Sequence, residues 1–272
     1  MYIDGVDAYS AYGVSVSEAG YDDLVCLPMM KAIPFNDWHE RDGIEPDLSA
    51  PVVESRDIVI PFHVYDVQDG YNAFIRAITD GAYHLYHFEK IGLSRRLRLK
   101  SCGDLSSICG LGSFVLTFSD DDPLTEAAQP SSSMKKYGDF LLDGVDLANY
   151  GIRVLRGTMD SVIKMPDVKE NLKRDISVSN GVSYDGAKVT FKSRTAQVKC
   201  LMKAASAEEF WNNRSALISA LVKPGSRTIT IDTLGKDIPC YYKGSTVSCF
   251  FPDRGRLWFE FTLDLEFYKG VI

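Results

Sequence analysis

The side chains that could support catalysis or metal binding are few and scattered. Of the four histidines, His84 and His87 are the closest pair, three residues apart. They lie in an expected strand, where residues three apart point to opposite faces, so the two rings would diverge and would not share a metal ion. No Gly-x-Ser-x-Gly, P-loop or dinucleotide-binding pattern is present. Gly110-Leu111-Gly112 precedes a strand rather than the helix that a phosphate cradle needs.

The aspartates favour turn geometry over acid–base chemistry. Asp4 and Asp7 flank a glycine, and Asp143 and Asp146 repeat that arrangement. Asp before Gly is typical of a tight turn, in which the carboxylate bonds its own backbone. The run Asp120-Asp121-Asp122 reads as a solvated loop rather than a metal site. We therefore predict no catalytic residue, no metal site and no cofactor, and we do not expect an enzyme.

Two surface features are candidates for recognition. Arg96, Arg98 and Lys100 share one face of an expected strand. They form either a solvated face that discourages edge aggregation or a subunit contact with the acidic linker or the acidic face of the last strand. Phosphate contact with passing DNA is a third reading. Trp38 and His39, in the loop 36–43, are candidates for surface recognition, although Trp38 also suits a core or an interface.

Composition limits the class of protein. The chain has 272 residues, which suits two domains, and 45% of them are hydrophobic, which is typical of globular proteins. A net charge of −7 argues against a general binder of nucleic acid or anionic membranes. No apolar run is long enough for membrane insertion, and the N-terminus does not resemble a signal peptide. With no export signal, we expect the six cysteines to be buried free thiols.

The strongest pattern is an internal repeat. Three blocks recur in the same order, and they are Asp4–Asp7 with Asp143–Asp146, Ser55-Arg56 with Ser193-Arg194, and 73–78 with 216–221. Three ordered matches indicate a duplicated domain. We predict one copy over residues 1–119, a polar linker over 120–138 and a second copy over 139–272.

Each copy combines strands with one helix. Asp-Gly between apolar runs predicts an opening hairpin in both copies. A helix is expected from Ser206, with a capping box through Glu209, and another around 71–78. Residues 257–267 alternate strictly between apolar and polar, which predicts a strand with one buried face. The fold class is therefore mostly β with a minor helical share: two tandem β-sandwich or barrel-like domains, each with one flanking helix.

The opening pattern, Asp-Gly-Val-Asp followed by Tyr12-Gly13-Val14 or Tyr150-Gly151-Ile152, resembles the distal tail protein family of phage baseplates. The resemblance implies tail-tube-like domains, no catalytic residues, and a phage or prophage virion structural protein. Such a protein would assemble in the bacterial cytoplasm into the virion tail, as a ring around a central channel. It would contact other tail proteins, and DNA only in passage. The resemblance also implies rings of six such domains, so two copies per chain favour a trimer with pseudo-sixfold symmetry, with a hexamer as the other option. The alternative function is a carbohydrate- or cell-surface-binding β-sandwich module.

Overall fold

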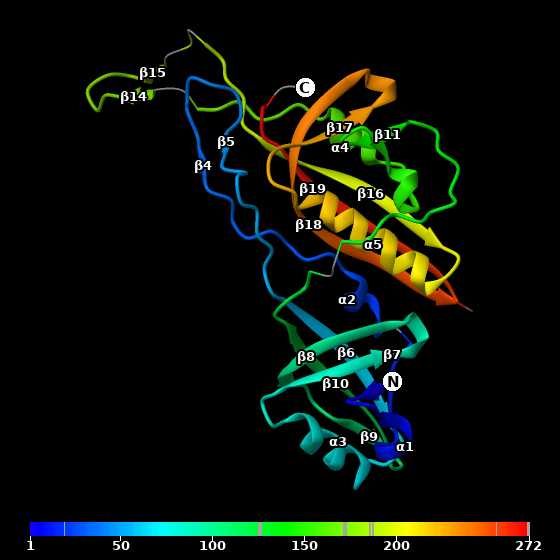
Figure 1. The fold of residues 1–272 in the computed structure, drawn as a ribbon. Helices are drawn as coiled ribbons and strands as arrows, with labels where there is room; N and C mark the ends of the chain where they lie inside the picture. Colours follow the sequence, from blue (N-terminus) through cyan, green and yellow to red (C-terminus); the bar gives the residue numbers. More distant parts are fainter. Residues whose placement is uncertain are drawn as a thin grey trace.

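A computed structural model describes residues 1–18, 20–124, 127–170, 173–184, 186, 188–253 and 255–270. Two large curled sheets dominate it, with few helices (Figure 1). The predicted mostly β class with a minor helical share is confirmed.

The first sheet and its attachments occupy the first half of the chain. Its strands are β1 (Tyr2–Ile3), β2 (Val6–Asp7), β3 (Val14–Val16), β6 (Arg56–Val64), β7 (Tyr83–Phe88), β8 (Leu93–Cys102), β9 (Ser106–Ile108) and β10 (Leu111–Asp120). The other elements are α1 (Ala8–Tyr12), α2 (Asp22–Val25), β4 (Phe35–Asn36), β5 (Glu45–Pro46), α3 (Gly70–Ile78) and the 3-10 turn η1 (Glu89–Ile91).

The second sheet is built from the second half. Its strands are β11 (Phe140–Leu142), β12 (Val145–Asp146), β13 (Ile152–Val154), β16 (Arg194–Ala204), β17 (Arg227–Ile231), β18 (Lys236–Asp253) and β19 (Arg256–Phe267). The other elements are η2 (Leu147–Tyr150), α4 (Thr158–Ile163), β14 (Lys173–Asp175), β15 (Val182–Tyr184), α5 (Ala207–Leu221) and η3 (Asp232–Leu234).

The two sheets have the same strand order. The first runs β2-β1-β7-β8-β10-β6-β3 and the second β12-β11-β17-β18-β19-β16-β13. The repeated register agrees, since Val14 lies opposite Val64 in the first sheet and Ile152 opposite Met202 in the second. Both halves therefore follow one plan, while the domain boundaries at 119 and 139 stay a prediction. Thr125 and Glu126 of the predicted linker lie outside the described residues.

Both predicted hairpins are present. Asp4 and Gly5 have φ values of 49° and 85°, and Asp143 and Gly144 have 49° and 78°. Two consecutive positive φ angles are the signature of a type I′ turn, in which glycine is favoured because it carries no Cβ. The turns join β1 to β2 and β11 to β12, which places these hairpins at the end of each sheet.

The two predicted helices are α3 and α5. Ser206 caps α5 by accepting a hydrogen bond from the Glu209 amide (3.1 Å), and the Glu209 carboxylate accepts one from the Ala205 amide (2.8 Å). That return bond is one residue earlier than a standard capping box provides. The sequence did not predict the short helices α1, α2 and α4, because four to six residues are too few to display helical periodicity.

The last strand, β19, supplies the core of the second half. Every second side chain from Leu257 to Phe267 is buried, as the alternation predicts. Glu266 is also buried, contrary to its expected outward position. It is tolerated because Thr195 Oγ1 and Lys243 Nζ donate hydrogen bonds to its carboxylate at 2.7 and 3.1 Å.

The prediction that the aspartate run 120–122 is a solvated loop is wrong for Asp120. It ends β10, it is buried, and its carboxylate accepts a hydrogen bond from Arg56 Nε at 2.9 Å. The pairing of β6 with β10 brings these two residues opposite each other, so the ion pair follows from the register.

The cysteine prediction is wrong in part. All six are free thiols, but only Cys200 and Cys240 are buried, whereas Cys102 and Cys109 are exposed. Cys109 has a positive φ of 50° and lies with Gly110 in the turn between β9 and β10, so its side chain is held outside the sheet.

The two halves share one continuous apolar core, and α5 forms the seam between them. In Figure 1 this helix lies along the second sheet on the side of α2. Arg214 of α5, only 1% exposed, donates to the Val25 carbonyl at 2.9 Å and to the Cys26 carbonyl. Trp211 Nε1 of the same helix donates to the Ile91 carbonyl at 2.7 Å.

Candidate functional site: open ribbons, basic strand and paired arms

The long β18–β19 hairpin forms a ribbon at one side of the second sheet, with β16 paired along the other edge of β19 (Figure 1). β17 pairs with β18 only over Lys236–Cys240. The next residues are covered by the first half, since the Met30 amide donates to the Lys243 carbonyl at 2.8 Å. From Thr246 to Asp253, no other strand in the described part of the chain pairs with the outer edge of β18.

The first half has the equivalent ribbon. β7 pairs with β8 only as far as Arg98, and beyond that point β8 and β9 pair with β10. Each ribbon presents an exposed apolar cross-strand pair. Ile108 (76% exposed) lies opposite Leu111, and Phe251 (61%) lies opposite Trp258 (47%). Open edges with apolar pairs are suited to protein contacts.

The edge on the other side of each sheet is covered instead. Asp23 of α2 accepts a hydrogen bond from the Val59 amide (2.9 Å), and Ser161 of α4 accepts one from the Gln197 amide (2.8 Å). These are equivalent positions in the two halves. The sequence reasoning missed this cover, because no local pattern links a short helix to a strand more than 30 residues away.

Two features limit backbone pairing along the β18 edge. Pro252 has no amide hydrogen, and the register shifts between Val247 and Cys249 as at a β-bulge. Backbone addition to this ribbon would therefore be short. Side chains such as Phe251 would supply most of the contact.

The basic strand, β8, carries the predicted subunit-contact residues. Arg98 lies 3.1 Å from Asp121 and Lys100 lies 2.6 Å from Asp57, both within the chain, while Arg96 is exposed. Hydrogen bonds from Ser119 and Tyr83, and then Arg98, hold the pKa of Asp121 below its usual value. Arg98 thus meets the acidic run of its own chain.

A hollow of about 500 Å³ lies beside this strand, between β7, β8 and the acidic run. Its lining includes Leu85, Arg96, Asp122 and Leu124. Opposite charges line one space, so the hollow has no single electrostatic preference. Whether Arg96, Arg98 and Lys100 make a subunit contact stays a prediction.

Trp38 and His39 lie at the turn of the first arm, the segment 30–53 that contains β4 and β5. The second arm, the described part of 168–191 with β14 and β15, lies beside it (Figure 1). Trp38 is 49% exposed, and its indole nitrogen donates to Glu45 at 3.0 Å. The His39 side chain is exposed, while its carbonyl accepts a hydrogen bond from Thr190 Oγ1 at 2.7 Å.

The turn is held by a buried lysine from the second arm. Lys169 Nζ donates to the Asp37 carboxylate, to the Trp38 carbonyl at 2.9 Å and to the Gly43 carbonyl. An ammonium group that meets three oxygens has its donors satisfied, which makes its burial tolerable. The sequence carries no signal for this contact, because the two segments are distant along the chain.

The histidines and aspartates that the sequence singles out lie in separate hydrogen-bonding environments. His84 and His87 contact different partners, Asp4 and Ser94 respectively. The Asp4 carboxylate accepts from the Leu85 amide of the neighbouring strand at 2.9 Å, not from its own turn, which corrects the expected role. Within the described residues, no group of three or more His, Cys, Asp or Glu side chains could hold a metal ion.

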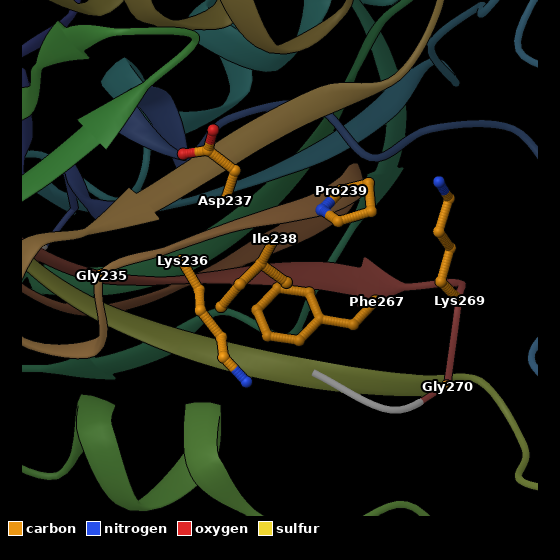
Figure 2. Close-up of a pocket in the computed structure, with 8 residues that line it drawn as sticks. All are labelled: Gly235, Lys236, Asp237, Ile238, Pro239, Phe267, Lys269 and Gly270. Carbon is orange, nitrogen blue, oxygen red and sulfur yellow. The ribbon is translucent and has the colours of Figure 1, made fainter.

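A second hollow, of about 420 Å³, lies between the start of β18 and the end of β19. Figure 2 shows Lys236 and Ile238 on one side of the strand and Asp237 on the other. The Asp237 carboxylate already accepts from Thr230 Oγ1 at 2.6 Å. The rest of the lining consists of two lysines, two glycines, Ile238, Pro239 and Phe267.

No family model and no curated protein matches this chain. Among solved structures, it is similar to the Dit protein (gp 19.1) of SPP1, described as a paradigm of the hub adsorption apparatus in phages that infect Gram-positive hosts. The TM-score is 0.33 and the identity 10%, over 97% of this chain and 96% of that one. In the described part of this chain, no helix has the length and apolar character needed to cross a membrane.

Proposed function

We propose that this chain is a structural component of a phage tail or a related injection apparatus, and that it assembles into a ring around a central channel. The phage role rests on the sequence resemblance of the Asp-Gly-Val-Asp and Tyr-Gly motifs to the distal tail protein family. The ring rests on the duplicated architecture.

The observation that carries the proposal is the repeated open ribbon. Each sheet has one long ribbon whose outer edge is open in the described residues, and one edge covered by a helix. Contact of this open edge with a different surface of the next unit would be head-to-tail. Such contacts close into a ring when the rotation between units is a fraction of a turn.

The number of chains in the proposed ring follows from the duplication together with the six-unit rings that the family resemblance implies. With two equivalent units per chain, three chains supply six units, and we favour a trimer with pseudo-sixfold symmetry. A hexamer, with one unit in the ring and the other peripheral, is the competing arrangement. Other tail proteins would stack above and below, and DNA would pass through the channel.

Light scattering and electron microscopy of the purified full chain test the proposal. We expect a particle of three 30.3 kDa chains with six lobes around a channel. Phe251→Asp, combined with Ile108→Asp, should reduce the mass to that of one chain, because each change places a charge in an apolar contact. Val178→Asp, at an exposed position outside both ribbons, is the matched control and should leave the ring intact.

Two outcomes would count against the proposal. One is a chain that stays monomeric at high concentration, both alone and when co-expressed with neighbouring tail proteins. The other is a ring that survives the double substitution unchanged, which would place the contact elsewhere.

Trp38 favours the alternative, a carbohydrate-binding module. Its ring is half exposed at the end of a projecting arm, and its indole nitrogen is fixed by Glu45, as a stacking platform for a sugar would require. A glycan array with the wild-type chain and Trp38→Ala separates this role from assembly. Hits that disappear with the substitution support it, and an array without hits rejects it.

A further inference from the structure

The type I′ turns of the two sheets are fastened to the neighbouring strand in the same way. The Asp4 amide donates to the Leu85 carbonyl, and the Asp4 carboxylate accepts from the Leu85 amide, both at 2.9 Å. In the second sheet, Asp143 and Thr228 make the same two bonds, both at 2.8 Å. The aspartate thus joins each end hairpin to the next strand.

The cation that faces this aspartate differs between the two sheets. In the second sheet it is Arg227, whose Nη1 lies 2.6 Å from the Asp143 carboxylate. In the first sheet the equivalent position holds His84, whose Nδ1 lies 2.6 Å from the Asp4 carboxylate. One position therefore carries a permanent charge and the other a titratable one.

The surroundings of His84 favour its charged form on geometry alone. Its second ring nitrogen, Nε2, lies 3.0 Å from the Asp80 carboxylate, and the residue is only 8% exposed. Carboxylates only accept hydrogen bonds, and a neutral imidazole has one donor. Only the imidazolium form can donate to Asp4 and Asp80 together.

The other groups near the ring do not supply a competing charge. β8 places the apolar Leu97 opposite His84, and the neighbouring arginines Arg96 and Arg98 alternate to the other face. Arg95 shares the face of Leu97, but its guanidinium is engaged by the Asp120 carboxylate at 3.5 Å and by the Pro123 carbonyl. Tyr86, the next residue on the same face of β7, is buried with a hydroxyl that has no hydrogen-bond partner among the described residues. Its pKa is raised by burial and then by Asp4 and Asp80, so it is neutral.

The direction of the His84 pKa shift agrees with the hydrogen-bond geometry. Burial disfavours the charged ring, but the hydrogen bonds that His84 donates to Asp4 and Asp80 outweigh it and raise the pKa of His84. A raised pKa means that the contribution of His84 is complete at low pH and is lost as the pH rises through the folded-state value.

We propose that His84 is a pH-sensitive latch that holds the β1–β2 hairpin on the first sheet, and that Arg227 is its pH-independent counterpart on the second. Deprotonation leaves a nitrogen lone pair facing a carboxylate, so the hairpin detaches more readily. Because β2 and β1 end the first sheet, detachment exposes the edge of β7, Tyr83–Phe88. The inference is independent of the proposed phage role.

Hydrogen exchange of the full chain between pH 6 and 9, read by mass spectrometry and corrected for intrinsic exchange, tests the latch. The peptide covering β1–β2 should lose protection as the pH rises, by at most about tenfold per pH unit, because one proton is involved. The peptide covering β11–β12 in the same sample is the internal control and should keep its protection.

Exchanging the two side chains makes the test reciprocal. His84→Arg should abolish the pH dependence at β1–β2, and Arg227→His should create it at β11–β12. The second variant stands alone if the first fails to fold. Equal pH profiles for the two hairpins in the wild type, an unchanged profile in His84→Arg, or no new dependence in Arg227→His would each overturn the proposal.

Discussion

Replacing Arg214 tests whether α5 holds the two halves of the chain together. This guanidinium is 1% exposed and faces the carbonyls of Val25 and Cys26, at the C-terminal end of α2. Burial, and then the nearby charges of Arg56 and Arg95, lower the pKa of Arg214 to about 9. The charge is compensated by carbonyl dipoles, which favour a cation at a helix C-terminus.

The loss in free energy of unfolding caused by Arg214→Met depends on which hydrogen-bond donors the Val25 and Cys26 carbonyls retain. Cys26 retains a donor, because Arg56 Nη1 lies 2.6 Å from its oxygen. The Val25 carbonyl loses Arg214 Nε, the donor that the described residues give it, and an unsatisfied buried acceptor costs about 1–3 kcal/mol. Removing the desolvation cost of a buried charge that faces carbonyls rather than a carboxylate offsets part of this. We expect a net loss of about 1–2 kcal/mol, and about 3–5 kcal/mol for Arg214→Ala, which also leaves a cavity.

Urea unfolding followed by tryptophan fluorescence measures the effect, since Trp211 lies 5.5 Å from the Arg214 guanidinium. Arg76→Met is the matched control, because Arg76 is an exposed arginine on α3. Its cost should stay within about 0.5 kcal/mol. If Arg214→Met proves no more costly than Arg76→Met, the buried arginine does not fasten α5 to α2.

Three further predictions concern caps, acid stability and thiols. Asp146→Ala should cost about 1–2 kcal/mol, because this carboxylate caps η2 and accepts from three amides. Asp7→Ala should cost less in the same urea titration, since both of its backbone bonds are 3.3 Å long. Burial alone would raise the pKa of Glu266, but hydrogen bonds from Ser193, Thr195 and Lys243 lower it. Its contribution is therefore present above pH 4.5 and lost on acidification, so the stability gap between wild type and Glu266→Gln should narrow below that pH; a constant gap contradicts this. Exposed Cys102 should react with a thiol reagent in the native chain, whereas Cys200, whose pKa is raised by burial, should react only on unfolding, as mass spectrometry of the labelled peptides would show.

The sequence predicts what depends on neighbours along the chain. The alternation from Leu257 to Phe267 indicates which side chains face the core, so β19 can be predicted from the sequence alone. The Asp-Gly turns and the Ser206 cap can be predicted for the same reason, since each is formed by residues within four positions of one another along the chain. The sequence also contains a sign that Arg214 is buried, because this residue lies on the same helical face as the apolar Trp211 and Ile218.

What the sequence conceals depends on register between distant segments. Asp120 looks like part of a loop until β6 places Arg56 beside it. Lys169 looks like any surface lysine until the second arm places it in the turn at Trp38. The open edge of β18 from Thr246 onward depends on where β17 stops pairing and on how far the first half covers the next residues, which no local pattern encodes.

The backbone hydrogen bonds that the first arm makes to the second half of the chain have a consequence for synthesis on the ribosome. The Gly43 amide bonds the Phe191 carbonyl at 2.7 Å, and the Ile44 amide bonds the Tyr268 carbonyl at 2.8 Å. Both partners are synthesised well over a hundred residues after the first arm. The first arm therefore stays without these contacts until Phe191 and Tyr268 have left the exit tunnel. A stop codon placed anywhere before Phe191 would release a product whose Trp38 turn can never close.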